Sequence, residues 1–367
     1  MRAMTVIGLM SGTSFDGVDM ALIETDGETV ARIGPSSYRT YAEAERMVLR
    51  AALAEAVSLT DRNARPGALA EAEALVTRAH AEAVDTFLKA HGLAAGRIGA
   101  IGFHGQTVLH RPRERLTVQI GGGAALARRF GIPVVYDFRA ADVAAGGEGA
   151  PLLPVYHRAL ALRSGLRGPV AVVNLGGVGN ITYLDGDSDP VAFDTGPANA
   201  PIDDLVFKRT AERCDLDGRL AAAGTVNESL AAAVLKHPFF ARRPPKSLDR
   251  AEFASLPLND LSLEDAAATA TAIVAASVAR ALDFLPKRPA IFIIAGGGAS
   301  NPTMLKMLRT RLGGEVRTAN ELGWSADALE AQGFAYMAVR SLRGLPITFP
   351  TTTGVQSPLT GGVLARP

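Results

Sequence analysis

The chain has 367 residues, 48% of them apolar, and its 38 basic and 37 acidic side chains leave a net charge of +1. The length is close to that of two typical domains, and the apolar share predicts a globular protein with substantial cores. Without a charge excess, neither nucleic acid nor a membrane surface is an expected partner, so a small-molecule ligand is favoured.

The cysteine content and the first residues bear on the compartment. Cys214 is the only cysteine, which excludes an intramolecular disulfide and a cysteine-based zinc site. The chain begins with a strand-like run, residues 4–10, and not with the basic start and long apolar stretch of a signal peptide. We therefore expect a cytoplasmic protein.

The first 165 residues predict alternating strands and helices. Two apolar runs, 4–10 and 18–24, flank the polar stretch SGTSFDG and predict a hairpin with a long loop. Apolar residues at three- and four-residue spacing predict two amphipathic helices, at about 41–56 and 67–91. Further strands are expected in RIGAIGFHG (97–105), in LTVQI (116–120) and at 132–136, before a glycine-rich loop.

The second part of the chain repeats this form. Residues 169–199 again join apolar strands through turns of glycine and amide side chains, so two related halves are expected. Later elements are a helix near 200–213, a long alanine-rich helix at 263–284, the strand of IFIIAGGGASNP (291–302) with a helix opening at Asn301-Pro302, and a last helix at 325–342. Strands alternating with helices indicate an α/β chain, and the hairpins indicate mixed sheets.

Glycine clusters follow several of the apolar strands. They stand at 121–123, 176–177 and 296–298, and the first hairpin turn adds Gly12 and Gly17. Because α/β folds place ligands at the carboxyl ends of strands, this repetition favours a nucleotide site. Both the Walker pattern and the G-x-G-x-x-G fingerprint are absent. A split site remains, in which turns from two halves hold the phosphates. Such an arrangement resembles the actin-like ATPase fold of sugar kinases and Hsp70.

A closer resemblance is carried by eight motifs. The chain is similar to 1,6-anhydro-N-acetylmuramic acid kinases in GLMSGTSFDGVD, FHGQTVLHRP, GIPVVYDFRAADVAAGGEGAPLLP, NLGGVGNIT, FDTGPAN, PPKSLDR, AGGGASNP and ALEAQGFAYMA, in family order from Gly8 to about Ala338. Two positions depart from the family pattern. Gly122 replaces a usual Asp, a change that could alter a polar contact near the cleft. Ala198 replaces a usual Gly, which matters little unless the position needs a positive φ.

The resemblance implies a two-domain actin-like ATPase fold with mixed sheets and a central nucleotide cleft. Residues 1–165, joined by the C-terminal segment 345–367, would form one domain and residues 166–344 the other. It also implies a homodimeric enzyme that uses ATP and water to convert 1,6-anhydro-N-acetylmuramic acid to N-acetylmuramic acid 6-phosphate. Two other interpretations stay open: an ordinary amino-sugar kinase that acts on a free 6-hydroxyl, and an actin-like ATPase scaffold without a sugar acceptor.

Asp194 in FDTGPAN is the candidate catalytic base. The acceptor is the bridging ether oxygen of a bicyclic acetal, so some group must deliver water to the anomeric carbon. An ionised carboxylate can accept the proton of that water. Asp194 also matches the family's catalytic position. The alternative is an Asx-turn carboxylate that caps the next helix.

The turn after the first strand is the candidate phosphate loop for ATP. Asp16 and Asp19 are the candidate Mg²⁺ ligands, since Mg²⁺ is held typically by one or two carboxylates with phosphates and water. Turn formation is the alternative for this loop. By the family pattern, the candidate ATP phosphate loop comprises Gly12, Thr13, Ser14, Phe15, Asp16, Gly17, Val18 and Asp19. In the split site we also expect Gly176, Gly177 and Asn180 to face the phosphates and Gly296, Gly297 and Gly298 to face the adenosine.

Candidate sugar contacts lie in the last helix and in FHGQT. Glu330 matches a family carboxylate that contacts the sugar, although the pattern alone would place it on a solvated helix face. His104, Gln106 and Thr107 follow a strand and could bind sugar hydroxyls or the acetamido group, but a histidine there is often structural.

A short basic run, Arg242, Arg243 and Lys246, is a solvated loop or a substrate clamp. The lactyl carboxylate of the sugar needs a cationic or amide partner, which the sequence does not identify.

Overall fold

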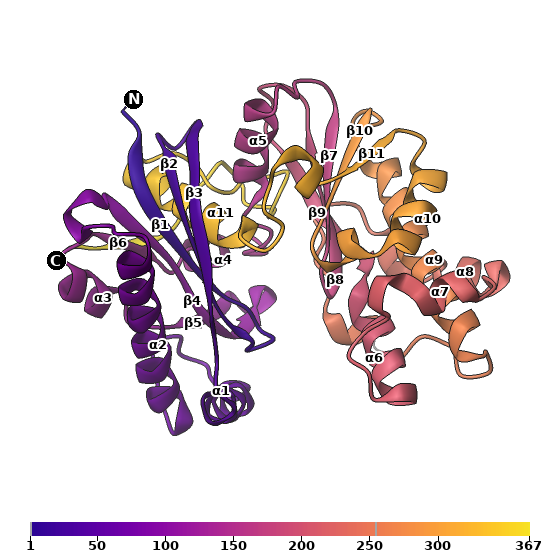
Figure 1. Cartoon of the computed structure of the whole chain (residues 1–367), viewed down its shortest axis with the longest axis horizontal. Coiled ribbons are helices and arrows are strands. Elements are labelled where there is room, and N and C mark those ends of the chain that lie inside the picture. Colours follow the sequence, from indigo (N-terminus) through magenta and orange to yellow (C-terminus); the bar gives the residue numbers. More distant parts are fainter. Residues whose placement is uncertain (1, 254) are drawn as a thin grey trace. The chain divides into compact units, whose positions relative to one another are not determined.

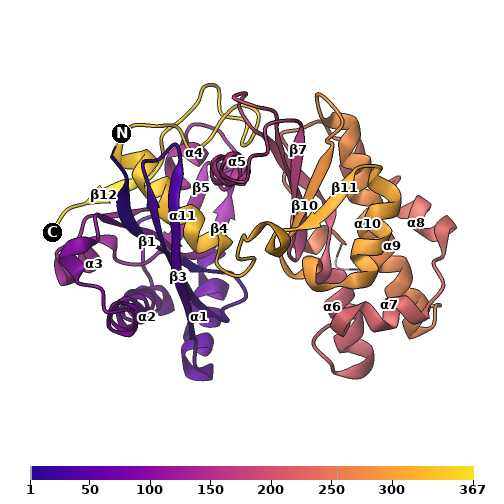
Figure 2. The same cartoon turned by 45° about the horizontal axis from the view of Figure 1, so that its top comes forward.

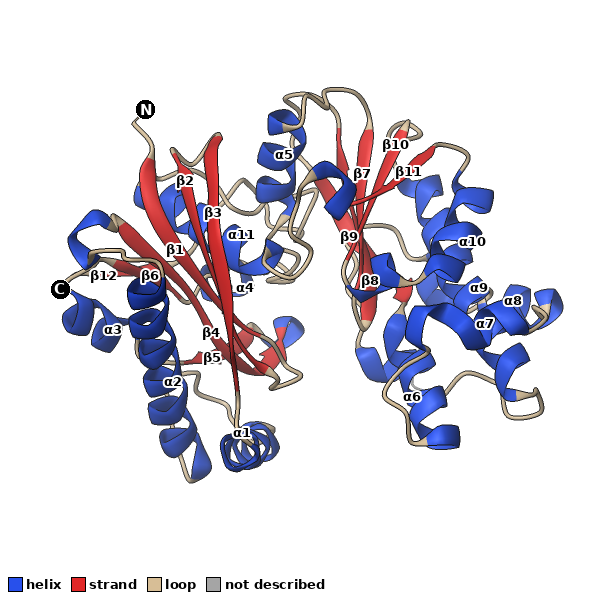
Figure 3. Cartoon of the chain, in the orientation of Figure 1, coloured by secondary structure: helices blue, strands red, loops and turns tan. Residues whose placement is uncertain are grey.

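The chain forms two compact units, each with its own sheet, in a computed structural model that describes residues 2–253 and 255–367 (Figure 1). Unit 1 comprises Met1–Arg163 and Asp327–Pro367, and unit 2 comprises Ser164–Ala326. In both units the strands lie in one sheet with helices packed against it (Figure 3).

Unit 1 is built on a seven-stranded mixed sheet of order β12-β6-β4-β1-β2-β3, with β5 paired to β4. β1, β2 and β3 form an antiparallel meander, and β4 and β6 run parallel to β1. The predicted first hairpin is confirmed by the β1–β2 pair. The strands are β1 (Met4–Ser11), β2 (Gly17–Thr25), β3 (Val30–Thr40), β4 (Ala100–Arg111), β5 (Leu116–Ile120), β6 (Val134–Tyr136) and β12 (Val363–Ala365).

The two faces of this sheet carry different helices. Alternate residues of a strand point to opposite faces, and Ile7, Leu9 and Phe103 point into a core shared with α1 and α2. Gly8 and Gly102 point the other way, toward α11. The helices of unit 1 are α1 (Glu43–Ala56), α2 (Ala68–Ala90), α3 (Gly123–Phe130), α4 (Ala140–Ala144), α5 (Pro154–Arg163) and α11 (Leu329–Leu342).

Helix α11 lies unusually close to the sheet. A Cβ atom at Gly8 would come within 1.7 Å of the carbonyl oxygen of Ala331, and one at Gly102 within 2.1 Å of that of Phe334. Non-bonded atoms do not come this close to one another, so only glycine, which has no Cβ atom, allows the helix to lie here. The two glycines thereby set where the first turn of α11, with Glu330, stands beside the strands.

Unit 2 repeats the topology of unit 1 in a five-stranded sheet of order β11-β10-β7-β8-β9. Its first three strands form an antiparallel meander, and β10 and β11 run parallel to β7. This is the order β6-β4-β1-β2-β3 of unit 1. The repetition confirms the predicted α/β class with mixed sheets and two related halves. The strands are β7 (Val170–Leu175), β8 (Val178–Leu184), β9 (Val191–Pro197), β10 (Ile291–Ala295) and β11 (Glu315–Thr318).

Helix α9 (Leu263–Ala281) is the core helix of unit 2. With the following turn, Leu282–Phe284, it is the one helix among the described residues long and apolar enough to cross a membrane by length and composition alone. Most of it is buried inside unit 2, which accounts for its apolar sequence. The other helices of unit 2 are α6 (Asn199–Thr210), α7 (Arg219–Ala223), α8 (Glu228–Val234) and α10 (Pro302–Leu312).

Several predicted elements match the structure closely, including α1, α2 and α9. Asn301 is the N-cap of α10, as predicted, and its side chain accepts a hydrogen bond from the Met304 N–H at 2.9 Å. Strands β3 and β11 were not predicted. Both are edge strands with few buried residues, so neither carries the continuous apolar run that marks a buried strand.

The last helix differs most from its prediction. It begins at Leu329 and not at 325, and it packs on β1, β2 and β4 of unit 1, although the second domain was predicted to extend to residue 344. Figures 1 and 2 both show α11, in yellow-orange, against the indigo strands of unit 1. The sequence shows that this helix has an apolar face, but it does not show which of the two similar sheets that face covers.

Candidate active site

The predicted phosphate loop is the turn between β1 and β2. The N–H of Phe15 donates to the carbonyl of Gly12 at 3.2 Å, and Phe15 adopts a left-handed backbone with φ of 56°. Its ring and the side chain of Val18 are buried in the core of unit 1, so both residues could contact a nucleotide only through their backbones. Thr13 and Ser14 are exposed, and their hydroxyl groups are accessible.

A chain of hydrogen bonds fixes this loop to β4. The Ser11 hydroxyl donates to Oε1 of Gln106 at 2.6 Å and accepts from the Tyr41 hydroxyl at 3.2 Å. Gln106 donates from Nε2 to the carbonyl of Gly12 at 3.0 Å. Its side chain is fully buried. In this structure the amide group of Gln106 holds the predicted phosphate loop, and its predicted contact with the sugar stays a prediction.

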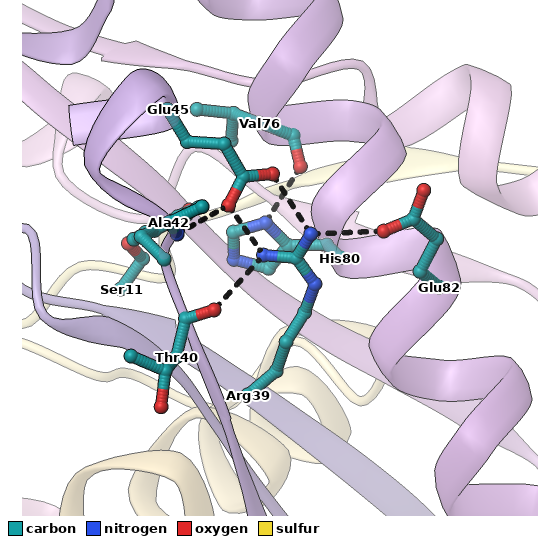
Figure 4. A network of polar contacts seen from close by, with 9 residues as sticks. Ser11, Arg39, Thr40, Ala42, Glu45, Val76, His80 and Glu82 are labelled. Atoms are coloured by element: carbon teal, nitrogen blue, oxygen red, sulfur yellow. Dashed lines mark hydrogen bonds and ion pairs between the residues drawn. The ribbon is translucent and has the colours of Figure 1, made fainter. Parts of the chain in front are cut away.

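The strand beside the loop is held by a second polar network. Arg39 of β3 contacts Glu45 of α1 at 2.8 Å and Glu82 of α2 at 2.9 Å, as Figure 4 shows. Glu45 also accepts from the N–H of Ala42 at 2.8 Å, at the start of α1. Nearby, burial lowers the pKa of His80 to about 4, so this ring is neutral. The network links α1 and α2 to β3. Because β3 pairs with β2, the network also stabilises the strand that follows the loop.

Negative charge accumulates at the end of the phosphate loop. Burial, and after it the negative charges of Glu330, Asp327 and Asp16, raise the pKa of Asp19 to about 6. Within the described residues no group of three or more His, Cys, Asp or Glu side chains is arranged to hold a metal ion. Mg²⁺ bound to a nucleotide needs only one or two carboxylates, and a cation would relieve the repulsion at Asp19. Asp16 and Asp19 therefore fit the predicted ion.

The raised pKa of Asp19 predicts a pH effect on stability. Between pH 4 and pH 6 the folded protein keeps a proton at Asp19 that the unfolded chain has released, so this group lowers stability as the pH rises through that window. The substitution Asp19→Asn should raise the Tm at pH 7 by roughly 2–4 °C, corresponding to about 1 kcal/mol after allowing for partial exposure. It should also flatten the dependence of Tm on pH between 4 and 6.

Calorimetry of the Mg²⁺-free protein from pH 4 to pH 8 measures both effects. Glu71→Gln, at an exposed position of α2, is the control and should leave the curve unchanged. A lower Tm at pH 7 for Asp19→Asn would show that its carboxylate stabilises the fold.

His104 and Glu330 are linked through Arg139, which sequence reasoning did not single out. His104 donates from Nδ1 to the carbonyl of Gly105 at 2.8 Å, so its Nε2 accepts from Arg139, at 3.1 Å from Nη2. Burial and then the charge of Arg139 lower the pKa of His104 well below its ordinary value, which keeps the ring neutral. His104 therefore orients Arg139. The only sequence signal for Arg139 was its place in the quoted motif GIPVVYDFRAADVAAGGEGAPLLP.

Glu330 stands in the first turn of α11, as predicted. Its side chain reaches solvent. Partial desolvation by the surrounding protein raises the pKa of its carboxyl group, and the positive charge of Arg139 opposes that shift. Thr107 is half-buried and accepts a hydrogen bond from Gln119 at 3.3 Å. Sugar binding by Glu330, His104 and Thr107 stays a prediction.

The glycine-rich loop after α4 is held in place by buried contacts. Asp142 accepts hydrogen bonds from the Gly149 N–H at 2.7 Å and from the Thr353 hydroxyl at 2.6 Å. Arg139 donates to the carbonyl of Gly149 at 2.8 Å. The loop therefore holds Nη1 of Arg139, while His104 contacts Nη2.

In unit 2, three polar residues form a row across the sheet. Asn174 of β7 lies opposite Asn180 of β8, which lies opposite Asp194 of β9. Their strand neighbours Leu175, Ile181 and Phe193 belong to the core beneath α9 and α10, so the row lies on the other face. All three are half-exposed on an otherwise buried sheet. Unit 2 thus brings Asn180 and Asp194 together, and the row adds Asn174, which was not predicted although it begins the motif NLGGVGNIT.

The predicted glycines of unit 2 gather at one end of β7 and β10. Ala295 pairs with Asn174, and Gly296 follows with φ of 74°. A Cβ atom at Gly296 would lie 2.5 Å from Oδ1 of Asn174, so the backbone can pass here only as glycine. Asn199 closes the Gly176–Gly177 turn, because its N–H donates to the carbonyl of Gly176 and its side chain to that of Leu175, both at 2.8 Å. The two turns therefore adjoin one another.

Asp194 does not occupy a capping position. The N-cap of α6 is Ala198, whereas Oδ2 of Asp194 accepts a hydrogen bond from the Leu248 N–H at 2.8 Å. The Asp194 N–H donates to the carbonyl of Lys246 at 3.1 Å. The alternative of an Asx-turn cap is thus not supported, and the segment PPKSLDR contributes a contact that orients this carboxylate.

The two departures from the family pattern are accommodated differently. Ala198 has φ of −132°, so the methyl group causes no backbone strain there. Gly122 donates to the Thr77 hydroxyl at 2.8 Å and lines a groove of about 790 Å³ between α2 and α3. In the described structure Gly122 therefore contacts α2 through its backbone.

Comparison with known proteins gives matches along nearly the whole chain. A family profile described as anhydro-N-acetylmuramic acid kinase matches residues 4–366. The anhydro-N-acetylmuramic acid kinase of Rhodopseudomonas palustris (strain HaA2) is 60% identical, with 99% of this chain and 100% of that protein covered. The protein of the same name from Nitrobacter winogradskyi is 58% identical over the same shares.

Among solved structures, component A of the (R)-2-hydroxyglutaryl-CoA dehydratase of Acidaminococcus fermentans is similar with a TM-score of 0.48 and 12% identity, covering 92% of this chain and 99% of that one. The match to the family profile and the identity to its members extend over every motif described above. The chain therefore belongs to the anhydro-N-acetylmuramic acid kinase family.

Proposed function

We propose that this protein is an ATP-dependent kinase that opens the 1,6-anhydro ring of 1,6-anhydro-N-acetylmuramic acid as it phosphorylates O6. The products are N-acetylmuramic acid 6-phosphate and ADP, as in the recycling of peptidoglycan fragments. The single observation that carries the proposal is the family match over residues 4–366, which includes both phosphate turns and Asp194.

The reaction needs one water molecule and one base. Water attacks the anomeric carbon and loses a proton to the Asp194 carboxylate, and the bond from that carbon to the bridging oxygen breaks. The released oxygen takes the γ-phosphoryl group of ATP, whose bond to the β-phosphate oxygen breaks to leave ADP. An ionised carboxylate at a fixed orientation suits this role, and the Leu248 N–H supplies that orientation.

The protein's other groups position the substrates. The backbone of residues 12–17 and the hydroxyls of Thr13 and Ser14 would hold the phosphates in unit 1, and the turns at 176–177 and 296–298 offer backbone groups in unit 2. Asp16 and Asp19 would hold Mg²⁺, which neutralises charge on the transferred phosphoryl group. Glu330, oriented beside Arg139, would contact the sugar. We further propose a cytoplasmic homodimer, by likeness to the family.

Mass spectrometry of the product formed in ¹⁸O-labelled water tests the proposal. Ring opening by water should place one heavy oxygen at the anomeric position during turnover. Unlabelled product kept in the same water for the same time corrects for later exchange. An unlabelled product would indicate an ordinary sugar kinase. ADP release that does not respond to added sugar would indicate an ATPase without a sugar acceptor.

A further inference from the structure

The basic run Arg242, Arg243 and Lys246 contains a lysine that turns inward. Lys246 is only 7% exposed, whereas Arg243 in the same run is exposed. Lys246 is therefore neither part of a solvated loop nor free to clamp a substrate. Burying an ammonium group is costly unless it gains specific contacts, so this position calls for a physical explanation.

The contacts of Lys246 come from aromatic rings and one carbonyl. Its Nζ lies 4.5 Å from the ring centroid of Phe239, 4.7 Å from that of Phe284 and 5.7 Å from that of Phe193. It also donates to the carbonyl of Phe239 at 3.3 Å. Attraction between a cation and an aromatic face is stronger where water is excluded. The ammonium therefore pins its own segment to β9, to the turn at Pro238–Ala241 and to the turn after α9.

The segment pinned in this way is the one that touches Asp194. The carbonyl of Lys246 accepts from the Asp194 N–H at 3.1 Å, and the Leu248 N–H donates to Oδ2 of Asp194 at 2.8 Å. β9 is the last strand of its sheet, so residues 246–248 lie along an edge that no strand of the described sheet covers. Phe193 and Asp194 point to opposite faces, so the ammonium reaches the carboxylate through backbone contacts.

We propose that Lys246 is a positioning residue for Asp194, which it orients through the backbone of residues 246–248. The inference rests on the proposed function in taking Asp194 as the base. A hydrogen bond to an ionised carboxylate favours the ionised form. By holding the Leu248 N–H against Asp194, residues 246–248 therefore also favour the ionised carboxylate that accepts the proton. Burial and the charges of Arg242 and Arg280 lower the pKa of Lys246 to about 8, and Asp194 opposes that shift.

Lys246→Met is the variant that tests the proposal, because methionine fills a similar volume among the three rings and removes the ammonium. We expect kcat to fall by about 10- to 100-fold, as small misplacements of a reacting group do, with the KM for ATP unchanged. The acid limb of the kcat–pH profile should move to higher pH. Amide hydrogen exchange at Leu248 and Asp194 should become faster. Lys287→Met, at a surface lysine of unit 2 that is 68% exposed, is the matched control and should change none of these.

A lower Tm with wild-type kcat, pH profile and amide exchange would show that Lys246 serves stability alone and would overturn the proposal. If Lys246→Met does not fold, Phe239→Leu is the second variant, because it removes one of the three rings around the ammonium group. It should move the acid limb of the kcat–pH profile in the same direction, and an unmoved limb would count against the proposal. The amide exchange result also separates this inference from the proposed function. Full activity of an Asp194→Asn variant would refute the assigned base, whereas unchanged exchange at Leu248 would refute the anchor.

Discussion

The substitution Asp194→Asn should lower kcat by about 100- to 10,000-fold, the usual contribution of a general base. Asparagine keeps the shape of the side chain, and its carbonyl oxygen can still accept from the Leu248 N–H. The fold and the affinity for ATP should therefore be retained while the proton acceptor is lost. Steady-state kinetics with the anhydro sugar and ATP, together with the Tm, measure this separation.

The control for this experiment is Asp187→Asn, at an exposed position in the turn between β8 and β9. It removes the same charge from the same unit and should leave kcat unchanged. A near wild-type rate for Asp194→Asn would mean that another group activates water. In that case the polar row would have a purely binding role, and Asn174 and Asn180 would be the next residues to replace.

The second large effect is expected at the contact between α11 and the first sheet. Gly8→Ala or Gly102→Ala would place a Cβ atom against a backbone carbonyl of the helix, and a backbone cannot swing aside as a side chain can. Overpacking of cores typically costs about 1–3 kcal/mol, and we expect the upper end of that range or more here. A loss of about 3 kcal/mol corresponds to roughly 6–12 °C in Tm for a domain of this size.

Gly96→Ala is the matched control in unit 1, since no described atom lies within 4 Å of a Cβ atom built there. Its Tm should stay close to that of the wild type. The folded fraction of Gly8→Ala and Gly102→Ala should also lose activity, because α11 carries Glu330. A Tm equal to that of the control would mean that the helix can shift on the sheet at little cost.

Much of the fold of unit 1 could be predicted, because the signals were local. The hairpin of β1 and β2 was visible as two apolar runs around a polar turn, and α1 and α2 as apolar periodicity. The role of Gln106 could not be predicted, since its partners Ser11 and Gly12 lie more than ninety residues away. An amide in a motif looks the same whether it faces a ligand or holds a loop.

The same limit applies to Arg139, Asn174 and α11. Arg139 is positioned by the tautomer of His104, and Asn174 by the register of β7 against β8. Neither can be deduced from the spacing of residues in the sequence. Helix α11 has a clear apolar face, yet the chain contains two sheets of the same topology that could receive it. Close approach through Gly8 and Gly102 identifies the first sheet, and such complementarity is visible only in three dimensions.

The return of the chain to unit 1 at Asp327 has a consequence for synthesis on the ribosome. Unit 2 is one continuous stretch, so all of its strands are available once residue 326 has emerged. Unit 1 must wait for α11 and for β12, which lie near the end of the chain. Until then the part of the sheet face at Gly8 and Gly102 lacks α11, the helix that packs there. Domains generally fold as units during synthesis. Unit 2 is therefore expected to fold before unit 1 is complete. A nascent chain stalled before Leu342 should expose an apolar sheet surface of unit 1 to chaperones.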